Sequence, residues 1–289
     1  MIDVSHNPLQ RVFPGLFVLL WSTGFIGAKL GLPYAEPATF LLYRFGLVLA
    51  LLLPICWLSG ARWPAPRHTL HMAVAGVLLQ AGYLGGVFAS LHRGMPAGVS
   101  ALVTGLQPVF TAALGALLLG ERTGPRQWLG LALGLVGVTL VVADRIAVAR
   151  LELDAILLSL LALASITLGT VWQKRHGAAV DLRTGAAIQF IAAALVMAPF
   201  ALLLESGEVR WTGEFLFALA WLVLVLSLGA IFLLLYLIRQ GAATRVASLF
   251  YLVPPTTALI AWPLFGETYT AAAAAGMALG MLAVWLVTR

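Results

Sequence analysis

The chain has 289 residues, of which 62% are hydrophobic and 10% are charged, and its mean hydropathy is +1.01. Soluble domains carry about 25% charged residues, so this composition indicates a protein that lies in a lipid bilayer. It excludes a soluble enzyme, a nucleic-acid-binding protein and a secreted disulfide scaffold. The net charge of +6 is typical of basic side chains that contact an anionic membrane surface. The one cysteine, Cys56, lies in an apolar run, which predicts a buried thiol.

Ten stretches of the chain contain no Asp, Glu, Lys or Arg, and each approaches or exceeds the roughly 17–25 residues that a helix needs to cross a bilayer. In chain order they are 12–28, 45–61, 68–92, 94–120, 127–143, 155–173, 184–204, 215–238, 246–266 and 268–288. None shows the alternating pattern of a membrane β-barrel. The sequence therefore predicts an all-α polytopic membrane protein with ten transmembrane helices joined by short loops.

The basic residues predict the orientation of these helices. With the N-terminus in the cytoplasm, eleven basic residues lie inside and five lie outside, with Arg44 within a span. Cytoplasmic loops carry an excess of Lys and Arg, so both termini are expected in the cytoplasm. An even number of spans also requires the two termini to share a side.

The chain contains an internal repeat. A shift of 146 positions aligns 101–141 with 247–287, so that Pro108 matches Pro254 and Gly120-Glu121 matches Gly266-Glu267. A shift of 145 aligns earlier positions, among them Lys29 with Lys174. The predicted units are 12–143 and 155–288, each with five helices. Because five is odd, the second unit enters the membrane from the opposite side, and such inverted repeats are typical of transporters that work by alternating access.

Four short motifs carry a resemblance to a known family. They are Trp21-Ser-Thr-Gly-Phe-Ile-Gly-Ala-Lys29, Tyr43-Arg44-Phe45, Gln107-Pro108 with Gly120-Glu121-Arg122, and Tyr251-Leu-Val-Pro254 with Gly266-Glu267. In this order the chain resembles the EamA type of the drug/metabolite transporter superfamily over nearly its whole length. The resemblance implies a bacterial inner-membrane carrier that exports amino acids and related metabolites through a cavity lined by both halves. It does not imply a particular substrate.

Two prolines stand inside the predicted fourth and ninth spans. Pro108 and Pro254 each remove a backbone donor, which kinks a helix and frees the carbonyls of Thr104 and Phe250. One interpretation is that both kinks border the substrate path and act as bending points. The other is that they are packing kinks, since proline is common in membrane helices.

Polar and aromatic side chains deep in the spans are few, and the candidates for the substrate cavity are Trp21, Gln80, Tyr83, Gln107, Trp172 and Tyr251. Amide, phenol and indole groups on an apolar wall can orient an amphipathic solute such as an amino acid. Hydrogen bonds between helices and aromatic packing are the alternative roles for each of them.

The repeat also relates four charged residues. It pairs Lys29 with Lys174 and Glu121 with Glu267, so Lys29–Glu267 and Lys174–Glu121 are candidate ion pairs that alternately close the two sides. Capping and solvation of helix ends are the alternative. Arg44 is matched by Gln189, and both an anion contact and a lipid anchor remain open for it.

Two further patterns bear on packing and energy coupling. Gly130-x-x-x-Gly134 and Gly276-x-x-x-Gly280 predict close contact between the fifth and tenth spans, within one chain or between the subunits of a homodimer. The ten uncharged stretches hold no carboxylate, which argues against a glutamate-driven multidrug pump. It favours facilitated export, exchange, or coupling through a Glu at a helix end. No G-x-x-x-x-G-K motif is present, and neither a metal nor a cofactor is expected.

The sequence thus predicts a secondary transporter rather than an enzyme, with small metabolites, amino acids first, as cargo. Its expected partners are the small-molecule substrate and the lipid bilayer, and no nucleic acid. An exporter of drugs or sugar derivatives is the alternative within the same fold. A membrane-embedded enzyme and a passive channel are alternatives from other classes, but neither a suitably spaced acidic, His or Ser cluster nor a ring of like charges supports them.

Overall fold

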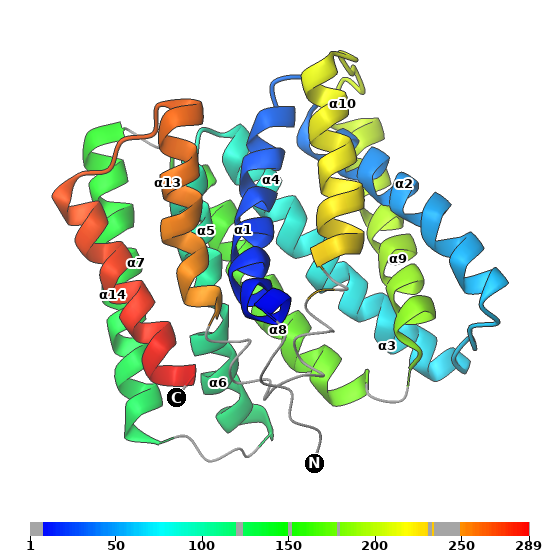
Figure 1. The fold of residues 1–289 in the computed structure, drawn as a ribbon, viewed down its shortest axis with the longest axis horizontal. Coiled ribbons are helices and arrows are strands. Elements are labelled where there is room, and N and C mark those ends of the chain that lie inside the picture. Colours follow the sequence, from blue (N-terminus) through cyan, green and yellow to red (C-terminus); the bar gives the residue numbers. More distant parts are fainter. Residues whose placement is uncertain are drawn as a thin grey trace.

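The computed structural model shows a bundle of helices (Figure 1) and describes residues 8–119, 124–149, 152–177, 180–230, 233 and 249–288. Its elements in chain order are α1 (Pro8–Gly31), α2 (Pro37–Leu58), α3 (Pro66–Gly76), the π-helical η1 (Val77–Gly82), α4 (Tyr83–His92), α5 (Ala97–Gly105), α6 (Gln107–Leu119), α7 (Pro125–Ala149), α8 (Leu153–His176), α9 (Leu182–Leu203), α10 (Gly213–Ala220), the π-helical η2 (Trp221–Ala230), the 3₁₀-helical η3 (Phe250–Leu252), α13 (Val253–Phe265) and α14 (Ala271–Thr288). The predicted all-α class is confirmed for these residues.

Seven helical segments of the described chain are long and apolar enough to cross a membrane. They are Val12–Gly31, Pro37–Leu58, Pro66–His92, Ala97–Leu114, Leu153–His176, Leu182–Leu203 and Gly213–Ala230. Three shorter apolar helices accompany them, at Pro125–Val141, Val253–Phe265 and Ala271–Leu286. The first turn of α1 and the last turn of α14 lie at the same end of the bundle (Figure 1).

Local sequence explains where several helices begin and end. Pro37, Pro66 and Pro125 open α2, α3 and α7, where the missing backbone donor costs nothing. Gly266 ends α13 with φ +64°, a left-handed conformation that glycine adopts without strain. The second helix begins earlier than the charge-free stretch 45–61 predicts. α2 starts seven residues before Arg44 and contains that charged residue.

Helical segments are interrupted at matching places in the two halves. The third segment contains the π-helical η1, and a shift of 145 maps its residues 77–82 onto 222–227, inside the π-helical η2. The fourth segment breaks at Leu106 between α5 and α6, and η3 precedes α13 in the other half. Repeated π-helical turns and breaks frequently mark functional positions in helices.

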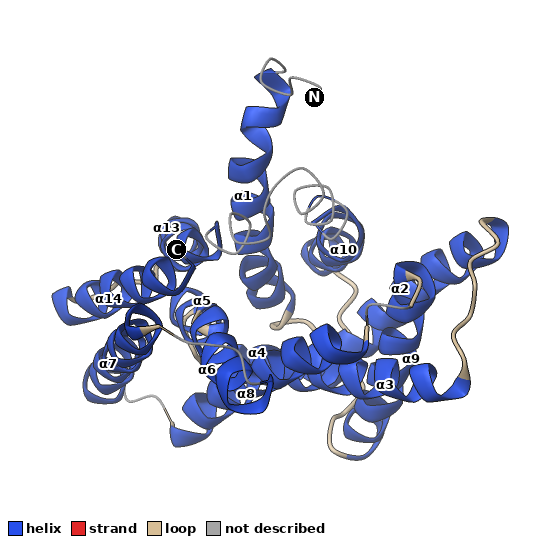
Figure 2. Cartoon of the chain, turned by 90° about the horizontal axis from the view of Figure 1, so that it is seen from below, coloured by secondary structure: helices blue, strands red, loops and turns tan. Residues whose placement is uncertain are grey.

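Contacts between helices follow the same correspondence. α2 packs on α9 and α7 on α14, each helix against its repeat counterpart, and α5 packs on α13, which is the counterpart of α6. α8 packs on α3, η1 and α4, as α1 packs on α10 and η2, and the α1–α13 contacts correspond to the α8–α6 contacts. Seen along the bundle, α7 and α14 form one edge while α2, α3 and α9 form the other (Figure 2).

Glycines bring α7 and α14 together within one chain. A Cβ added to Gly137 would lie 2.7 Å from the carbonyl oxygen of Gly276, and one added to Gly276 would lie 2.6 Å from that of Gly137. The close contact of these helices was predicted from their glycine motifs. The glycine of α7 that approaches Gly276 is Gly137, which is not part of the predicted Gly130-x-x-x-Gly134 motif.

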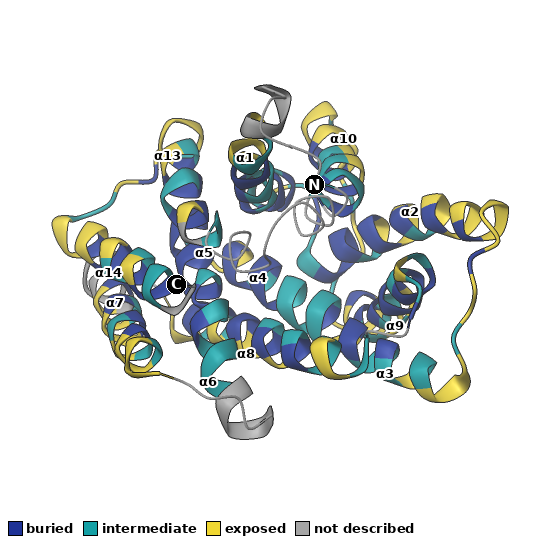
Figure 3. Ribbon diagram, turned by 60° about the horizontal axis from the view of Figure 1, so that its bottom comes forward, coloured by how far each residue is buried: buried dark blue, intermediate teal, exposed yellow. Residues whose placement is uncertain are grey.

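Burial divides the helices into inner and outer faces. Phe40, Phe45, Phe88 and Phe215 are among the large side chains that are fully buried, and Cys56 is buried as predicted. Exposed residues cover the outward faces of α2, α7 and α14 (Figure 3), and Trp57 is 81% exposed. Apolar outer faces of this kind are those expected of helices in contact with lipid.

Candidate functional site

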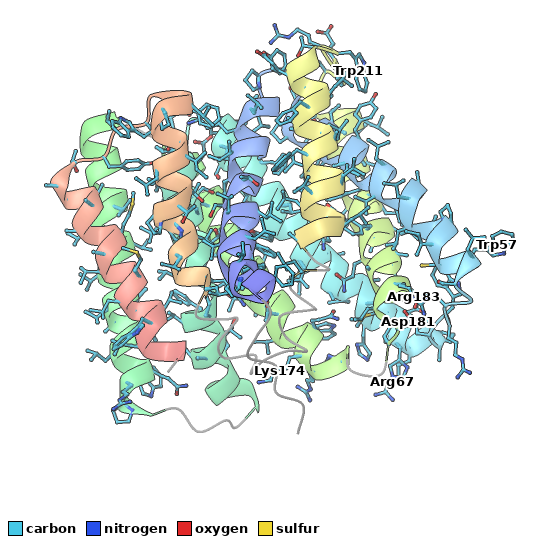
Figure 4. All side chains as sticks on the ribbon, viewed as in Figure 1. Trp57, Arg67, Lys174, Asp181, Arg183 and Trp211 are labelled. Carbon is cyan, nitrogen blue, oxygen red and sulfur yellow. The ribbon has the colours of Figure 1, made fainter. Side chains whose placement is uncertain are left out.

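The bundle has two polar ends. The Glu267 end, at the top of Figure 1, holds the last turns of α1 and α13 and the first turn of α2. The Lys174 end is opposite, and Figure 4 shows Arg67, Lys174, Asp181 and Arg183 there, whereas Trp211 lies at the Glu267 end.

A buried carboxylate joins the two halves of the chain at the Glu267 end. Glu267 accepts hydrogen bonds from Lys29 Nζ, from Tyr269 Oη, and from the backbone amides of Ala97 at 2.7 Å and Gly98 at 3.4 Å. We call these five residues the Glu267 cluster. Only 8% of Glu267 is exposed. The candidate pair Lys29–Glu267 is therefore in direct contact, and the same carboxylate also caps the start of α5.

The cluster stabilises the ionised form of Glu267. Burial raises the pKa of the carboxyl group, but hydrogen bonds from Lys29, Tyr269 and Ala97, with the Lys29 charge, lower it further than burial raises it. The net pKa lies below the ordinary value for Glu. The positive end of the α5 helix dipole acts in the same direction. Gly266 makes the arrangement possible, because its left-handed turn ends α13 one residue before Glu267.

Two further carboxylates tie α2 to the chain that follows α9 at this end. Glu205 accepts from the backbone amides of Ala38 and Thr39, each at 2.7 Å, and from the Thr39 hydroxyl at 2.8 Å. Glu36 accepts from the amide and hydroxyl of Ser206, and these bonds lower the pKa of Glu36. The start of α2 is thus held by groups from the second half of the chain.

The loop after α1 is bound to the same segment. The Arg210 amide donates to the Tyr34 carbonyl at 2.9 Å, and the Arg210 guanidinium donates to the Pro33 carbonyl. The Tyr34 hydroxyl donates to Glu214. Together with the Glu267 cluster, these contacts hold the two halves together across the Glu267 end.

The second candidate gate pair falls partly outside the described residues. Lys174 lies in the last turn of α8 (Figure 4), whereas Lys29 lies in the last turn of α1, at the opposite end of the bundle (Figure 1). Glu121 lies in the segment between α6 and α7 that is not described. Lys174–Glu121 therefore stays a prediction.

A surface pocket of about 340 Å³ lies at the Lys174 end, between the chain that follows α2 and the chain that precedes α9. It is lined by Gly60, Arg62, Trp63, Pro64, Val180, Asp181 and Arg183. Two hydrogen bonds from the Arg183 guanidinium, of 2.6 and 3.0 Å, and one from the Arg183 amide lower the pKa of Asp181 to about 2. The Arg183 guanidinium is thereby paired with Asp181.

Trp172 lies close to the Lys174 end rather than in the middle of the bundle. Its indole N–H donates to the His71 carbonyl at 3.1 Å, and its ring lies 4.4 Å from that of His176. The rings of His71 and His176 stack at 4.1 Å. These contacts match the packing alternative for Trp172, although a solute that enters from this end would pass near it.

Gln107 and Trp21 also have partners within the protein. Gln107 Nε2 donates to Thr111 and to Thr170 of α8, both at 3.1 Å. The Trp21 ring packs edge-on against Phe250 at 5.1 Å and lies tilted against Phe17 at 5.4 Å. Both side chains therefore link helices, which was the alternative to a role in the cavity. The side chain of Tyr251 lies outside the described residues.

Arg44 and Ser227 meet in the interior of the bundle, with Tyr83 in the vicinity. The Nε and Nη2 atoms of Arg44 donate to the Ser227 hydroxyl at 3.3 and 3.1 Å, and the Tyr83 phenol lies close enough to interact electrostatically. Arg44 is only 8% exposed. A lipid anchor would extend to the exposed end of its helix, which this side chain does not. Gln80, in η1, and Tyr83, directly after it, are both half-buried.

Each predicted bending proline follows a helix interruption directly. Pro108 is the second residue of α6, two residues after the break at Leu106, and Pro254 is the second residue of α13, after η3. The two breaks touch, since a Cβ on Gly105 would lie 3.1 Å from Pro254 Cγ. Ser22 of α1 donates to the Val253 carbonyl at 3.3 Å beside this contact.

Two of the residues that organise these sites, Ser227 and Glu205, belong to no recognisable sequence motif. Ser227 is one of few hydroxyls in the predicted span 215–238, and Glu205 directly follows the predicted span 184–204. Rarity of polar groups in an apolar segment marks Ser227, but its partner comes from 183 residues away. No local pattern relates such distant residues.

Similarity to known proteins shows the family of this chain. Residues 15–143 and 153–289 each match the EamA-like transporter family. An uncharacterized inner membrane transporter of Escherichia coli, YedA, is 29% identical over 99% of this chain and 93% of its own length. A probable amino-acid metabolite efflux pump of Salmonella typhimurium is 26% identical over 94% of this chain and 92% of its own.

Two further similarities agree with that assignment. The transporter YvbV of Bacillus subtilis, which is uncharacterized, is 27% identical over 93% of this chain and 88% of its own. A protein of known crystal structure shares the fold with a TM-score of 0.63 at 22% identity, over 98% of this chain and 99% of that one. The chain therefore belongs to the EamA-like transporter family.

Proposed function

We propose that this protein is a secondary transporter that exports small metabolites, amino acids first, across the bacterial inner membrane. The family and the relatives support transport, and one relative is named as a probable amino-acid metabolite efflux pump. The seven long and three shorter apolar helices would make the ten predicted spans, in two inverted units, 12–143 and 155–288, with both termini in the cytoplasm. The Lys174 end would then face the cytoplasm.

The observation that carries the proposal is the Glu267 cluster. It joins the start of α5 and the end of α1, in the first half, to Glu267 of the second half through a buried carboxylate. The helix contacts on either side of it correspond between the halves. A bundle of this kind can exchange one closed end for the other when its halves rock about a central site.

In an alternating-access cycle, one charged pair would break while the other forms. Opening of the Glu267 end requires that Lys29 and the amide of Ala97 leave Glu267. Breaking a buried ion pair costs roughly 3–5 kcal/mol when nothing replaces it. Formation of the related Lys174–Glu121 pair at the other end would offset that cost, so the two closed states can interconvert.

The test is counterflow in proteoliposomes made from the purified protein. Vesicles preloaded with one unlabelled amino acid receive the same radiolabelled amino acid outside, without an imposed gradient, and each common amino acid is assayed in turn. We expect saturable uptake that preloading stimulates, because a carrier returns faster when it is loaded. Protein-free liposomes are the control.

Three other results would change the proposal in defined ways. Uptake of a drug or sugar derivative but of no amino acid would keep the transporter and change its cargo. Uptake that appears only with an imposed proton gradient would indicate coupling. Uptake that never saturates would indicate a channel. A membrane-embedded enzyme has no support from the relatives, which are named as transporters.

A further inference from the structure

Arg44 is a buried cation with neutral partners. The guanidinium has five N–H donors, and two of its nitrogen atoms donate to the single oxygen of Ser227. No carboxylate of the described residues lies within ion-pair distance of it. Ser227 supplies no negative charge, and its own hydroxyl donates to the Leu222 carbonyl at 3.0 Å.

The chain places its carboxylates elsewhere. Each of the eleven Asp and Glu residues lies near a helix end or in a loop according to the sequence. Arg44 is the eighth residue of α2, so it lies about 10 Å along the helix from its first residue. An uncompensated charge at such a depth is costly and is a candidate for function.

The two halves differ at Arg44, whose neighbours are polar side chains. Both neighbours lie at the π-helical segments, since Tyr83 is the first residue after η1 and Ser227 lies within η2. The repeat counterpart of Arg44 is Gln189, which donates to Gln173 at 3.0 Å. A single cation therefore lies on one side of an otherwise matched pair of elements, and it suits a solute with one anionic group.

From this geometry we infer that Arg44 binds a carboxylate group of the transported solute, with Ser227 and Tyr83 holding the guanidinium in place. The inference rests on the proposed transport function and narrows its cargo to monocarboxylates, amino acids among them. The planar fork of Arg matches the two oxygens of a carboxylate, and the exclusion of water strengthens the contact. The carboxylate would supply the counter-charge that the described residues do not provide.

The first experiment compares solutes that differ in one group. For the amino acid that is transported best, uptake is competed with its carboxamide, its decarboxylated amine, and the acid without its amino group. We expect the acid to compete, and the two compounds without a carboxylate to compete roughly ten- to a hundredfold less well. Arg44→Met should abolish this discrimination, Arg44→Lys should weaken it, and Ser227→Ala should retain most of it.

The second experiment needs no transport. The melting temperature of the purified protein is measured with sodium acetate and with acetamide, and sodium chloride controls for a general anion effect. Acetate should raise the melting temperature of the native protein and not that of Arg44→Met. Without ligand, Arg44→Met should melt no lower than the native protein, since it removes a charge for which the described residues hold no counter-charge.

These measurements separate the possible failures. Transport without preference for a carboxylate would overturn the inference and leave the transporter standing. Stabilisation by acetate without any transport would support the carboxylate site at Arg44 and contradict the proposed transport function. Equal stabilisation by chloride, or a much lower melting temperature of Arg44→Met with its discrimination intact, would show that Arg44 is a general anion site or a link between helices.

Discussion

At the residue scale, Glu267 combines two roles that a sequence motif does not separate. It pairs with Lys29, and it also accepts from the amides of Ala97 and Gly98 at the start of α5. The cation can be exchanged for another group, whereas backbone donors require an acceptor at this position. The two roles therefore respond differently to substitution.

We predict that Lys29→Glu and Glu267→Lys each reduce counterflow at least about tenfold and that the double exchange recovers only part of the loss. Recovery is partial because a lysine at 267 pairs with Glu at 29 but accepts nothing from α5. The matched control is the exposed pair Arg93–Asp154, with a contact of 2.6 Å, whose exchange should have little effect. A double exchange no better than either single change would mean that the pair has no role in transport.

The pKa of Glu267 gives a prediction about pH. Because the folded pKa is lowered, the stabilisation by the ionised carboxylate is complete above the unfolded pKa and is lost only as the pH falls through the folded value. Glu267 should therefore stay ionised between pH 6 and pH 8, because this whole range lies well above the ordinary Glu pKa of about 4.3. Counterflow of the native protein and of Glu267→Gln should vary in parallel over this range, and divergence would indicate that Glu267 titrates there.

At the element scale, the interruptions of the helices matter more than the helices themselves. Pro108 and Pro254 begin new helical elements, and Gly105 brings the two breaks into contact. A break between packed elements allows one half of a segment to move while the other stays in place. Two prolines that lie within continuous helices, Pro54 and Pro199, provide the comparison, since the repeat relates them too and both are exposed.

We predict that Pro108→Ala and Pro254→Ala lower counterflow several-fold at unchanged membrane levels of the protein, while Pro54→Ala and Pro199→Ala leave counterflow nearly unchanged. Alanine supplies the backbone donor that proline lacks and favours a continuous helix across the break, which stiffens the segment. The measurements are initial counterflow rates and protein amounts in the membrane. Equal loss of rate and amount would show that the breaks serve folding only.

At the scale of the whole molecule, the Lys174 and Glu267 ends lie at opposite ends of the bundle, and we expect them to face opposite sides of the membrane. In a Cys56→Ser background, Glu208→Cys at the Glu267 end should react with an impermeant maleimide in intact cells. Ala65→Cys at the Lys174 end should react only after permeabilisation, since the basic end is expected inside. Both positions are exposed. The opposite labelling would reverse the orientation, and labelling of both in intact cells would contradict the topology.

The sequence alone determined the helical class, the family and the pairing of Lys29 with Glu267 as a candidate, because composition, hydropathy and the repeat are local or periodic properties. Tertiary structure decided the rest. The candidates Gln107, Trp21 and Trp172 turned out to have partners in the protein, and Arg44 turned out to be buried against Ser227. Whether a polar side chain is satisfied depends on the residue opposite it, which a helix from another part of the chain supplies, and no local pattern encodes that residue.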